Sequence, residues 1–223
     1  MRIGIDVSQV VYGTGVSVYT KELVKALLSV DKENEYVLFG GSLRKRRELE
    51  SFSSSLAGKF TSKYYPFPPS LADFVWNRLH KFKIERFTGK LDVYHSSDWA
   101  QAPSEAYKIT TIHDLAPFKF PRLTPGNIIS THKARLKWIV EEVDRIIVPS
   151  QATKDDLVEL GMEEDRIRVI YEAPGAVFKP QSESEVNKVL RKYKINNKFI
   201  IIFCFFHQFF HVFDMDIVLS NNF

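Results

Sequence analysis

Two histidine-containing stretches hold the side chains that are best suited to chemistry. His113 and Asp114 directly follow the apolar run 109–112, and the stretch from His95 to Asp98 follows a second apolar run. A histidine at the end of a strand can donate a hydrogen bond to a ligand oxygen and can exchange a proton near neutral pH. The first stretch fits this role, and fits equally well a histidine that satisfies a loop carbonyl beside a turn-forming aspartate. For the second stretch, ordinary loop chemistry is the stronger interpretation.

Two glycines, Gly13 and Gly15, end the polar loop 8–15 near the start of the chain. The loop follows the apolar run 2–6, and apolar residues recur at helical spacing from residue 16 onward, which predicts a strand, a loop and a helix. Such a loop brings backbone N–H groups and a helix N-terminus close to a phosphate or sugar oxygen, because glycine has no Cβ to hold the ligand away. Two glycines after a strand also often mark only a tight turn, and both interpretations stay open.

Ser150 and Glu172 follow later apolar runs and could reach the same ligand, although a helix N-cap is the stronger interpretation of Ser150. The sequence contains neither the Gly-x-Ser-x-Gly pattern of serine hydrolases nor a Walker-type phosphate loop. His207 and His211 have helical i,i+4 spacing, but phenylalanines surround them and no acid lies between them, so we predict no metal site. Cys204 has no activating neighbour in the sequence and is interpreted as buried apolar filler.

The composition is that of a globular protein with an anionic partner. Of the 223 residues, 44% are hydrophobic and 26% are charged, and the single cysteine excludes a disulfide framework. The net charge is +4, but residues 1–198 contain 31 basic and 25 acidic residues, an excess of six. This excess suits a nucleotide, a phospholipid or a membrane surface and is too mild to predict nucleic-acid binding. Because the chain leads into a strand pattern without a long apolar segment, we expect a cytoplasmic location.

Strands and helices alternate along the chain in a way that predicts an α/β fold. Apolar runs predict seven strands, at residues 2–6, 36–40, 61–65, 91–95, 109–113, 145–149 and 166–170. Helical periodicity lies between them, at residues 16–27, 43–52, 71–87, 125–143 and 150–160. The alternation is typical of a doubly wound parallel sheet, a Rossmann-like domain over roughly residues 1–175. Ligands of such sheets bind at the carboxyl ends of the strands, so the candidate side chains should gather at one edge.

Six stretches in this order are similar to one enzyme family. They read MRIGID at 1–6, TGVSVYTKEL at 14–23, DVYHSSDW at 92–99, TIHDL at 111–115, IIVPS at 146–150 with TKDDL at 153–157, and VIYEAPG at 169–175 with FKP at 178–180. Their order and spacing resemble the N-terminal half of the retaining glycosyltransferases of family 4, also called group 1 glycosyltransferases, which have the GT-B fold. The resemblance extends from residue 1 to about residue 203. The stretches 92–99 and 172–174 are similar to mannosyltransferases within the family.

The resemblance implies a hexosyltransferase that moves a sugar from a nucleotide-sugar donor to a glycan or lipid-linked acceptor, with retention and without an obligatory metal or other cofactor. By analogy, Gly13 and Gly15 approach the donor phosphate or the acceptor. His113 reaches the transferring sugar and is the expected catalytic residue, while His95 and Asp98 line the acceptor side. The predicted binding set also includes Asp114, Ser150 and Glu172.

The resemblance implies two domains of unequal completeness. Residues 1–180 correspond to the acceptor-side domain, and residues 181–223 to a linker helix and the start of the donor-binding domain. After the expected strand 199–203 the family continues with a glycine turn, an Arg-Lys pair and a Glu-x7-Glu motif, whereas this chain continues with a phenylalanine-rich segment. Glu164 and Glu172 have the Glu-x7-Glu spacing but lie in the first domain, so we interpret the spacing as coincidence. We therefore expect a truncated or frame-shifted donor half, with a hydrophobic anchor as the alternative, and a chain that is inactive by itself.

Two other classes of function compete with sugar transfer. The chain could be a non-catalytic module that binds an acceptor, or one half of a two-chain glycosyltransferase. A Rossmann oxidoreductase is a weaker candidate, because the loop lacks Gly-x-Gly-x-x-Gly and no acid closes the next strand. The predicted helix 71–87 also carries Arg78, Lys81, Lys83 and Arg86 among aromatic residues, which suggests peripheral contact with an anionic membrane at its cytoplasmic face. A solvated basic face is the simpler interpretation of that helix.

Overall fold

The computed structural model describes residues 1–173, 175, 178–196, 199–203 and 210–214. The chain divides into two compact units, Met1–Ala173 and Pro174–Phe223, and each is described here by itself. The first unit contains every residue for which the sequence predicts a role in binding or catalysis.

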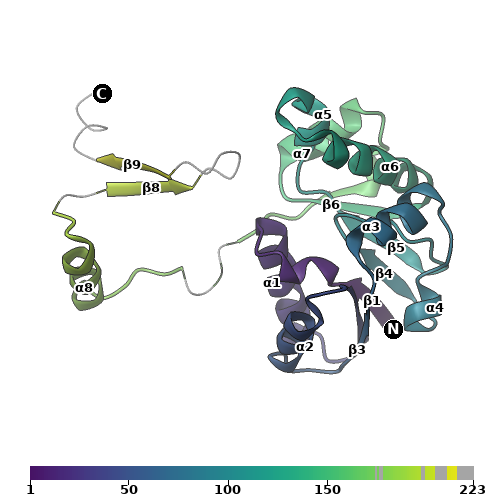
Figure 1. The fold of residues 1–223 in the computed structure, drawn as a ribbon, viewed down its shortest axis with the longest axis horizontal. Helices are drawn as coiled ribbons and strands as arrows, with labels where there is room; N and C mark the ends of the chain where they lie inside the picture. The colour runs from purple at the N-terminus through teal and green to yellow at the C-terminus, as the bar shows by residue number, and fades with distance from the viewer. Residues whose placement is uncertain (174, 176–177, 197–198, 204–209, 215–223) are drawn as a thin grey trace. The chain divides into compact units, whose positions relative to one another are not determined.

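A parallel sheet of seven strands forms the centre of the first unit (Figure 1). Its spatial order is β3-β2-β1-β4-β5-β6-β7, and every neighbouring pair is parallel. The strand order therefore reverses between β1 and β4, the point at which doubly wound sheets bind their ligands. The predicted doubly wound α/β fold is confirmed. The strands are β1 Arg2–Asp6, β2 Glu35–Gly41, β3 Phe60–Tyr65, β4 Val93–Ser96, β5 Tyr107–Thr111, β6 Arg145–Val148 and β7 Ile167–Val169.

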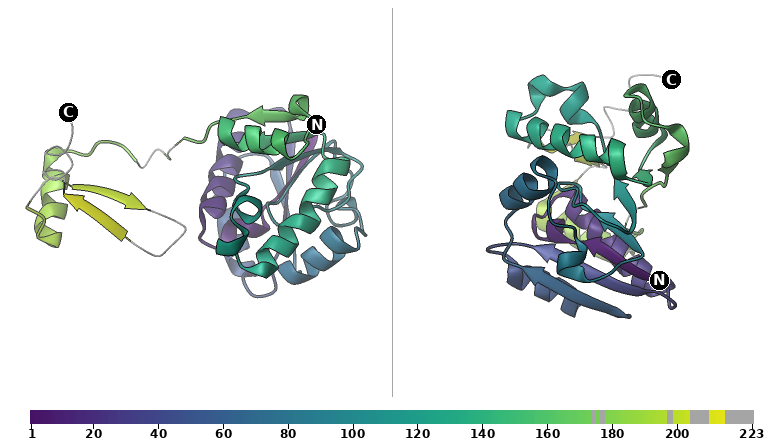
Figure 2. Two further views of the ribbon diagram at one scale, coloured as in Figure 1. Left: turned by 90° about the horizontal axis from the view of Figure 1, so that it is seen from above. Right: turned by 90° about the vertical axis from the view of Figure 1, so that its right-hand side faces the viewer.

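Helical segments connect the strands and lie on both faces of the sheet (Figure 2). Each parallel connection has to cross back over a face of the sheet, and a helix is the usual way to do so. The long helices of the first unit are α1 Gly15–Val30, α2 Arg46–Ser54, α6 Gly126–Glu142 and α7 Gln151–Glu159. The short helices are α3 Pro69–Ala72, α4 Glu85–Thr88, α5 Ala116–Lys119, a π-helix at Asp73–Arg78, and 3-10 turns at Ser8–Val11, Pro121–Leu123 and Glu164–Arg166.

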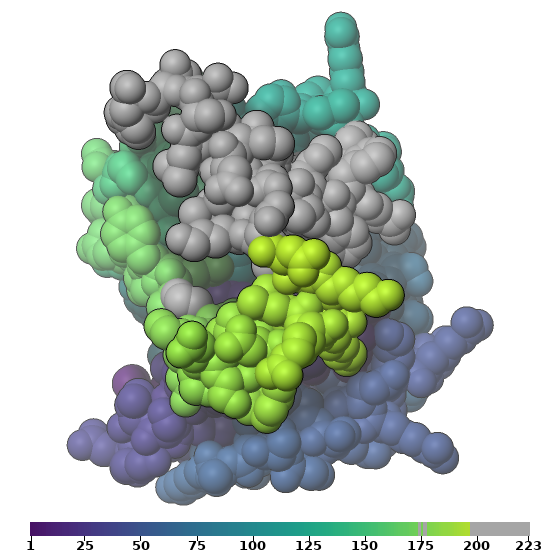
Figure 3. Space-filling view, turned by 90° about the vertical axis from the view of Figure 1, so that its left-hand side faces the viewer, coloured from purple at the N-terminus to yellow at the C-terminus, as the bar shows by residue number. Residues whose placement is uncertain are grey.

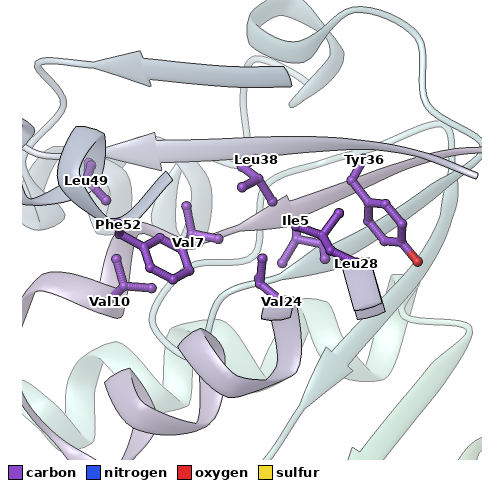
Figure 4. Close-up of a cluster of buried hydrophobic side chains, with 9 residues drawn as sticks. All are labelled: Ile5, Val7, Val10, Val24, Leu28, Tyr36, Leu38, Leu49 and Phe52. Carbon is purple, nitrogen blue, oxygen red and sulfur yellow. The ribbon is translucent and has the colours of Figure 1, made fainter. Parts of the chain in front are cut away.

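The side chains of β2 explain how two layers pack on one sheet. Successive side chains of a strand point to opposite faces. Tyr36 and Leu38 accordingly belong to the core under α1 and α2, whereas Val37 and Phe39 belong to the core under the π-helix and α4. The first of these cores consists of Ile5, Val7, Val10, Val24, Leu28, Tyr36, Leu38, Leu49 and Phe52 (Figure 4).

A polar cap fixes the start of α1 directly after the glycine loop. The Thr14 hydroxyl accepts a hydrogen bond from the Ser17 N–H, and the Ser17 hydroxyl in turn accepts one from the Thr14 N–H. This reciprocal pair satisfies two N–H groups that a helix start leaves free, and it sets the point at which the loop becomes helix. The Ser17 hydroxyl lies 2.5 Å from the carbonyl oxygen of Gln9 and so holds the loop against the helix.

The predicted helix 71–87 is wrong, because the segment breaks into three short pieces. His80 and Phe82 have φ values of +50° and +64°, which no helix accommodates. The indole N–H of Trp76 donates to the Phe82 carbonyl oxygen at 3.0 Å, and the Trp76 side chain is only 1% exposed. The break therefore lets the chain fold back over a buried tryptophan. As a consequence, Trp76 belongs to the core and not to a membrane-facing surface. The predicted start of the second helix at residue 43 is also wrong, since α2 begins at Arg46.

The second unit contains helix α8 Glu183–Tyr193, whose atoms appear in yellow-green in Figure 3, and strands β8 Phe199–Phe203 and β9 Phe210–Asp214. Ser182 caps α8 by accepting a hydrogen bond from the Glu185 N–H, and β8 pairs with β9 in antiparallel fashion. The helix and the first strand occur where the sequence predicts them. The predictions for Cys204 and His207 fall outside the described residues. Among the described helices, none is both long enough and apolar enough to cross a membrane.

A buried lysine near the start of β5 connects three elements of the first unit. Lys108 is 2% exposed, and its ammonium group donates to Glu142 at 2.9 Å. Glu142 also lies 2.6 Å from Nε2 of His80, whose ring stacks on Trp138. Burial lowers the pKa of Lys108, and the nearby Glu142 carboxylate opposes this effect. The carboxylate thus stabilises the charge that β5 carries into the interior.

We predict that Glu142→Gln lowers the free energy of unfolding by roughly 2–3 kcal/mol, because it leaves the Lys108 ammonium group buried without its counter-charge. Urea unfolding near neutral pH measures the change. Glu22→Gln is the matched control, since it removes an exposed partner of Lys25 at 2.8 Å and should cost less than about 0.5 kcal/mol. Equal losses in the two variants would contradict the stabilising role of the Lys108–Glu142 pair.

Candidate functional site

Two adjoining pockets lie at the carboxyl edge of the sheet, at the switch point between β1 and β4. Both are lined by Asp6, at the end of β1, and by Gln9, in the turn that follows. We call them the histidine pocket and the aromatic pocket. The histidine pocket is lined by Ile5, Asp6, Gln9, Tyr19, Thr20, Leu23, His95, Ser96, Asp98, Thr111 and His113. The aromatic pocket is lined by Asp6, Ser8, Gln9, Tyr12, Phe39, Gly41, Phe67, Pro69, Ala72, Trp76, Ser97, Trp99 and Ala100.

The histidine pocket brings together side chains from three elements that are far apart in the sequence. Nε2 of His95 and the hydroxyl of Tyr19 lie 3.0 Å and 3.1 Å from the Thr111 hydroxyl. The ring of Tyr19 also meets the ring of His113 edge to face, with 4.7 Å between centroids. Tyr19 therefore reaches from α1 to the ends of β4 and β5 and fixes both histidines beside one opening.

His95 is a neutral histidine at physiological pH. Burial, together with the smaller effects of the nearby His113 and the Arg135 guanidinium, lowers the pKa of His95 from 6.5 to about 4. A neutral imidazole has one nitrogen that donates and one that accepts a hydrogen bond. His95 can therefore orient a hydroxyl group, while a general acid role would require a proton that its surroundings disfavour.

His113 is positioned by contacts to both its ring and its backbone. Its Nδ1 lies 3.2 Å from a carboxylate oxygen of Glu172, which follows β7, and its carbonyl oxygen accepts a hydrogen bond from the Thr153 hydroxyl at 3.4 Å. A carboxylate beside Nδ1 favours the tautomer that carries the proton there. Nε2 of the neutral ring is then an acceptor for a hydroxyl proton. Glu172 thus contacts a residue that lines the histidine pocket.

Asp98 is tied to a buried arginine that the sequence did not indicate. A guanidinium nitrogen of Arg135 lies 3.4 Å from the Asp98 carboxylate, and another donates to the Thr110 hydroxyl and the Thr111 carbonyl oxygen at 3.1 Å and 3.0 Å. Arg135 comes from the middle of α6 and is 3% exposed. Together these contacts hold the ends of β4 and β5 against the helix layer. Within the described residues, the Nε atom of Arg135 is buried without a hydrogen-bond partner.

The remaining predicted residues, Gly13, Gly15, Asp114 and Ser150, line neither pocket. Gly13 has a φ of +69°, and a Cβ built on either Gly13 or Gly15 meets no atom within 4 Å, so the loop is open on its outer side. The Asp114 carboxylate accepts the Ala116 N–H at 2.8 Å and starts a turn. Ser150 caps α7 by accepting the Thr153 N–H at 3.1 Å. Direct ligand contacts by these four residues stay predictions.

Sequence reasoning missed four residues that shape the site, namely Gln9, Tyr19, Thr111 and Arg135. Thr111 could have been found, because it lies in the predicted strand 109–113, two residues before His113. Gln9 and Tyr19 flank the glycine loop, but nothing in their spacing showed which side chains turn inward. Arg135 carries no signal, since a basic residue within a helical pattern is typical of a solvent-facing position. In the part of the chain that the structure describes, no group of three acidic, histidine or cysteine side chains could hold a metal ion.

Asp6 joins the two pockets and is a buried carboxyl group. Asp6 is only 3% exposed. Its Oδ1 atom accepts hydrogen bonds from the N–H and the hydroxyl of Ser8 at 2.9 Å and 2.5 Å. Burial raises the pKa of Asp6 from 3.8 to about 6, although the hydrogen bonds from Ser8 and Ser97 counteract this rise. The folded protein therefore binds this proton more tightly than the unfolded chain does.

The raised pKa predicts a pH-dependent stability that Asp6→Asn removes. The stabilising contribution of Asp6 is present below about pH 4 and is lost as the pH rises through about 6. Relative to the unchanged protein, the free energy of unfolding of Asp6→Asn should gain roughly 1–3 kcal/mol between about pH 4 and about pH 8. Urea unfolding across this range measures it, with Asp155→Asn as the control for an exposed carboxylate. A difference that is the same at both pH values would show that Asp6 does not titrate in this way.

Comparison with known proteins assigns the chain to a family and extends the description of its fold. The model of glycosyltransferase family 4 matches residues 13–173. No curated protein matches the sequence. Two structures of HepE from Anabaena, in complex with UDP and glucose and with UDP-glucose, are similar at 13% and 15% identity, each with a TM-score of 0.53. In both cases the similarity covers 88% of this chain and 51% of HepE.

A third HepE structure, in complex with UDP, has a TM-score of 0.51 at 16% identity and covers 88% of this chain and 50% of HepE. At such identities the likeness shows a shared fold, and this chain spans about half the length of the structures it matches. The family assignment comes from the sequence model, whose match includes α1, both histidines and Glu172. Because that match extends over well more than half of its residues, this chain belongs to glycosyltransferase family 4.

Proposed function

We propose that this protein transfers a hexose from a nucleotide-sugar donor to a glycan or lipid-linked acceptor, with retention at the anomeric carbon. The observation that carries the proposal is the pair of histidines, His95 and His113, which Tyr19 and Thr111 hold beside one pocket at the switch point of a family 4 domain. The HepE structures of similar fold contain UDP, glucose or UDP-glucose. A nucleotide-hexose is accordingly the proposed donor class, with mannose as the sugar that the motifs favour.

His113 is the proposed catalytic residue. The Glu172 carboxylate keeps the proton on Nδ1, so Nε2 accepts a hydrogen bond from a hydroxyl group of the transferring sugar. Positive charge develops on that sugar ring as the donor phosphate departs, and groups that are already oriented stabilise this charge without reorganising. His95 and Asp98 act on the acceptor side, where a neutral imidazole and a carboxylate both orient hydroxyl groups. Gly13 and Gly15 leave open space for the donor phosphate or the acceptor.

The donor phosphate requires cationic partners that we assign to a second domain. The family match ends at residue 173, and the chain spans about half the length of HepE. We infer that residues 1–180 supply the acceptor side, and that residues 181–223 belong to the linker and to the donor-binding domain, which has to supply the rest. A cytoplasmic location and peripheral contact with an anionic membrane belong to the same proposal. Two basic residues of the surface proposed for that contact have acidic partners within this chain. Arg78 pairs with Asp73, and Lys83 pairs with Glu105.

Isothermal titration separates this proposal from its rivals. A glycosyltransferase domain should bind sugars or nucleotide sugars, and an oxidoreductase should bind NAD. A non-catalytic module should bind an acceptor but, in a separate rate assay, should support no turnover with any donor domain. The absence of sugar or nucleotide-sugar binding, together with tight NAD binding, would contradict the proposed function.

We predict that His113→Ala lowers turnover at least tenfold in a reconstituted two-domain enzyme, which corresponds to about 1.4 kcal/mol or more of transition-state stabilisation. The substitution removes the Nε2 acceptor and leaves the sugar without an oriented partner. Initial rates with UDP-glucose and GDP-mannose measure the effect. His132→Ala is the matched control, because His132 lies on α6 and lines neither pocket. Unchanged turnover in a folded His113→Ala enzyme would reduce His113 to a loop residue.

The 223-residue chain by itself should transfer sugar at no measurable rate. In the GT-B fold that the motifs resemble, the reaction takes place between two domains, and contacts to the departing phosphate supply much of the stabilisation. Transfer assays with several nucleotide sugars and simple glycosides test this expectation, and addition of a separate donor-binding domain provides the positive arm. Robust turnover by the chain without a partner would show that the acceptor-side domain already holds a complete site.

A further inference from the structure

His80 connects the π-helix to α6 through both nitrogens of its ring. Its Nδ1 lies 2.9 Å from the carbonyl oxygen of Trp76, and its Nε2 lies 2.6 Å from a carboxylate oxygen of Glu142. The side chain is only 11% exposed, and its ring stacks on the indole of Trp138 with 3.5 Å between centroids and 9° between planes. This bridge therefore joins two elements whose contacting residues are 62 positions apart in the chain.

Both partners of the ring can only accept a hydrogen bond. The Trp76 carbonyl oxygen has no proton to give. Partial burial favours the protonated form of Glu142, but the hydrogen bonds and charges of Lys108 and His80 outweigh it and lower the pKa of Glu142. A neutral imidazole has one N–H and can satisfy one of these acceptors, whereas an imidazolium satisfies both. The geometry therefore fits the doubly protonated ring, which the carboxylate and the face of Trp138 also favour.

Charged groups of both signs surround this ring. From α6, the Glu142 carboxylate attracts a charged imidazole, while Lys137 lies 4.4 Å from the centroid of the indole on which the ring stacks and opposes that charge. From β5, the ammonium group of Lys108 also opposes it, from a position 2.9 Å from the other carboxylate oxygen. The π-helix contributes Asp73 and Arg78, which pair with each other at 3.0 Å. One carboxylate thus holds the proton against two cations, so the bridge is not locked in one charge state.

The segment that the bridge holds also forms part of the wall of the aromatic pocket. Trp76 lines that pocket, and its carbonyl oxygen is one of the two anchors of His80. The next residue, Asn77, donates to the Trp99 carbonyl oxygen at 2.8 Å and accepts the Gln101 N–H at 2.9 Å. His80 itself has a φ of +50°, a conformation that is unfavourable for a residue with a side chain. Loss of one ring hydrogen bond therefore removes an anchor from a segment whose backbone is already strained.

We propose that the His80 bridge is a pH-sensitive latch between the π-helix and α6. It is closed while both ring nitrogens carry protons and opens when one proton leaves for the solvent. The neutral ring then keeps one of its two partners, and residues 76–82 can shift together with the wall of the aromatic pocket that they form. The latch is independent of the proposed function, because it is a property of the folded chain and its test needs neither sugar nor turnover.

The test follows hydrogen exchange of the 223-residue chain at about pH 5.5 and about pH 8, where an ordinary histidine is mostly charged and mostly neutral. The backbone N–H groups of Leu79 and Lys81 report on the latch, because they donate to the carbonyl oxygens of Phe74 and Val75 at 3.0 Å each. After correction for the intrinsic effect of pH on exchange, their protection factors should fall about tenfold or more between the two pH values. In ¹⁵N spectra, both ring nitrogens of His80 should carry protons at the lower pH.

Matched substitutions assign the response to one histidine. His80→Gln replaces the ring by an amide that does not titrate, and it should abolish the pH response of both protection factors. His80→Gly should do the same, and because glycine suits the positive φ, this variant decides the outcome if the glutamine variant fails to fold. His132→Gln, which removes a histidine from α6 itself, should keep the full response.

Three results would overturn the latch. The first is a pH response of the two protection factors that is the same in the unchanged protein and in the His80 variants. The second is a His80 ring that carries a single proton at the lower pH. The third is an equal fall in protection at Val37 and Leu38 in the middle of β2, since the pH would then act on the stability of the whole domain and not on one segment.

Discussion

Every strand of the first unit runs parallel to its neighbours, so each connection has to return across a face of the sheet before the next strand begins. Because of this constraint, helices cover both faces of the sheet, and the strands need apolar side chains on both sides. In β2, successive side chains accordingly belong to two different hydrophobic cores. It also places all carboxyl ends at one edge. The strand order reverses between β1 and β4, and the two pockets lie at this point. Asp6 and Gln9 line both of them.

Buried polar groups then decide how that edge is arranged. Arg135 donates to Thr110 and Thr111 on β5 and pairs with Asp98 after β4, so one guanidinium group holds two strand ends and α6 together. Its charge is one reason why His95 stays neutral. Lys108 and Glu142 connect β5 to α6 near the start of the strand. Both cations are nearly inaccessible, and each would be costly to bury without its carboxylate partner.

The two pockets divide the chemistry of the site between them. The histidine pocket is lined by His95, His113 and hydroxyl groups, whereas the aromatic pocket is lined by the rings of Phe39, Phe67 and Trp76, and the Asp6 carboxylate lines both. The break at His80 and Phe82 contributes to the second pocket, because the Phe82 carbonyl oxygen accepts the indole N–H of Trp76, which packs against Phe39 and Phe67. A continuous helix over the same residues would have no reason to fold back there.

The sequence by itself determined the strands, the main helices and the family, because hydrophobic periodicity and short motifs are local properties of the chain. It also predicted that His95 and His113 would lie at one edge, since parallel strands share their carboxyl ends. Only the tertiary structure decided that Tyr19 and Thr111 join these histidines, that Arg135 points inward and that residues 71–87 break around Trp76. These features depend on contacts between residues up to 92 positions apart, whose energies no local pattern contains.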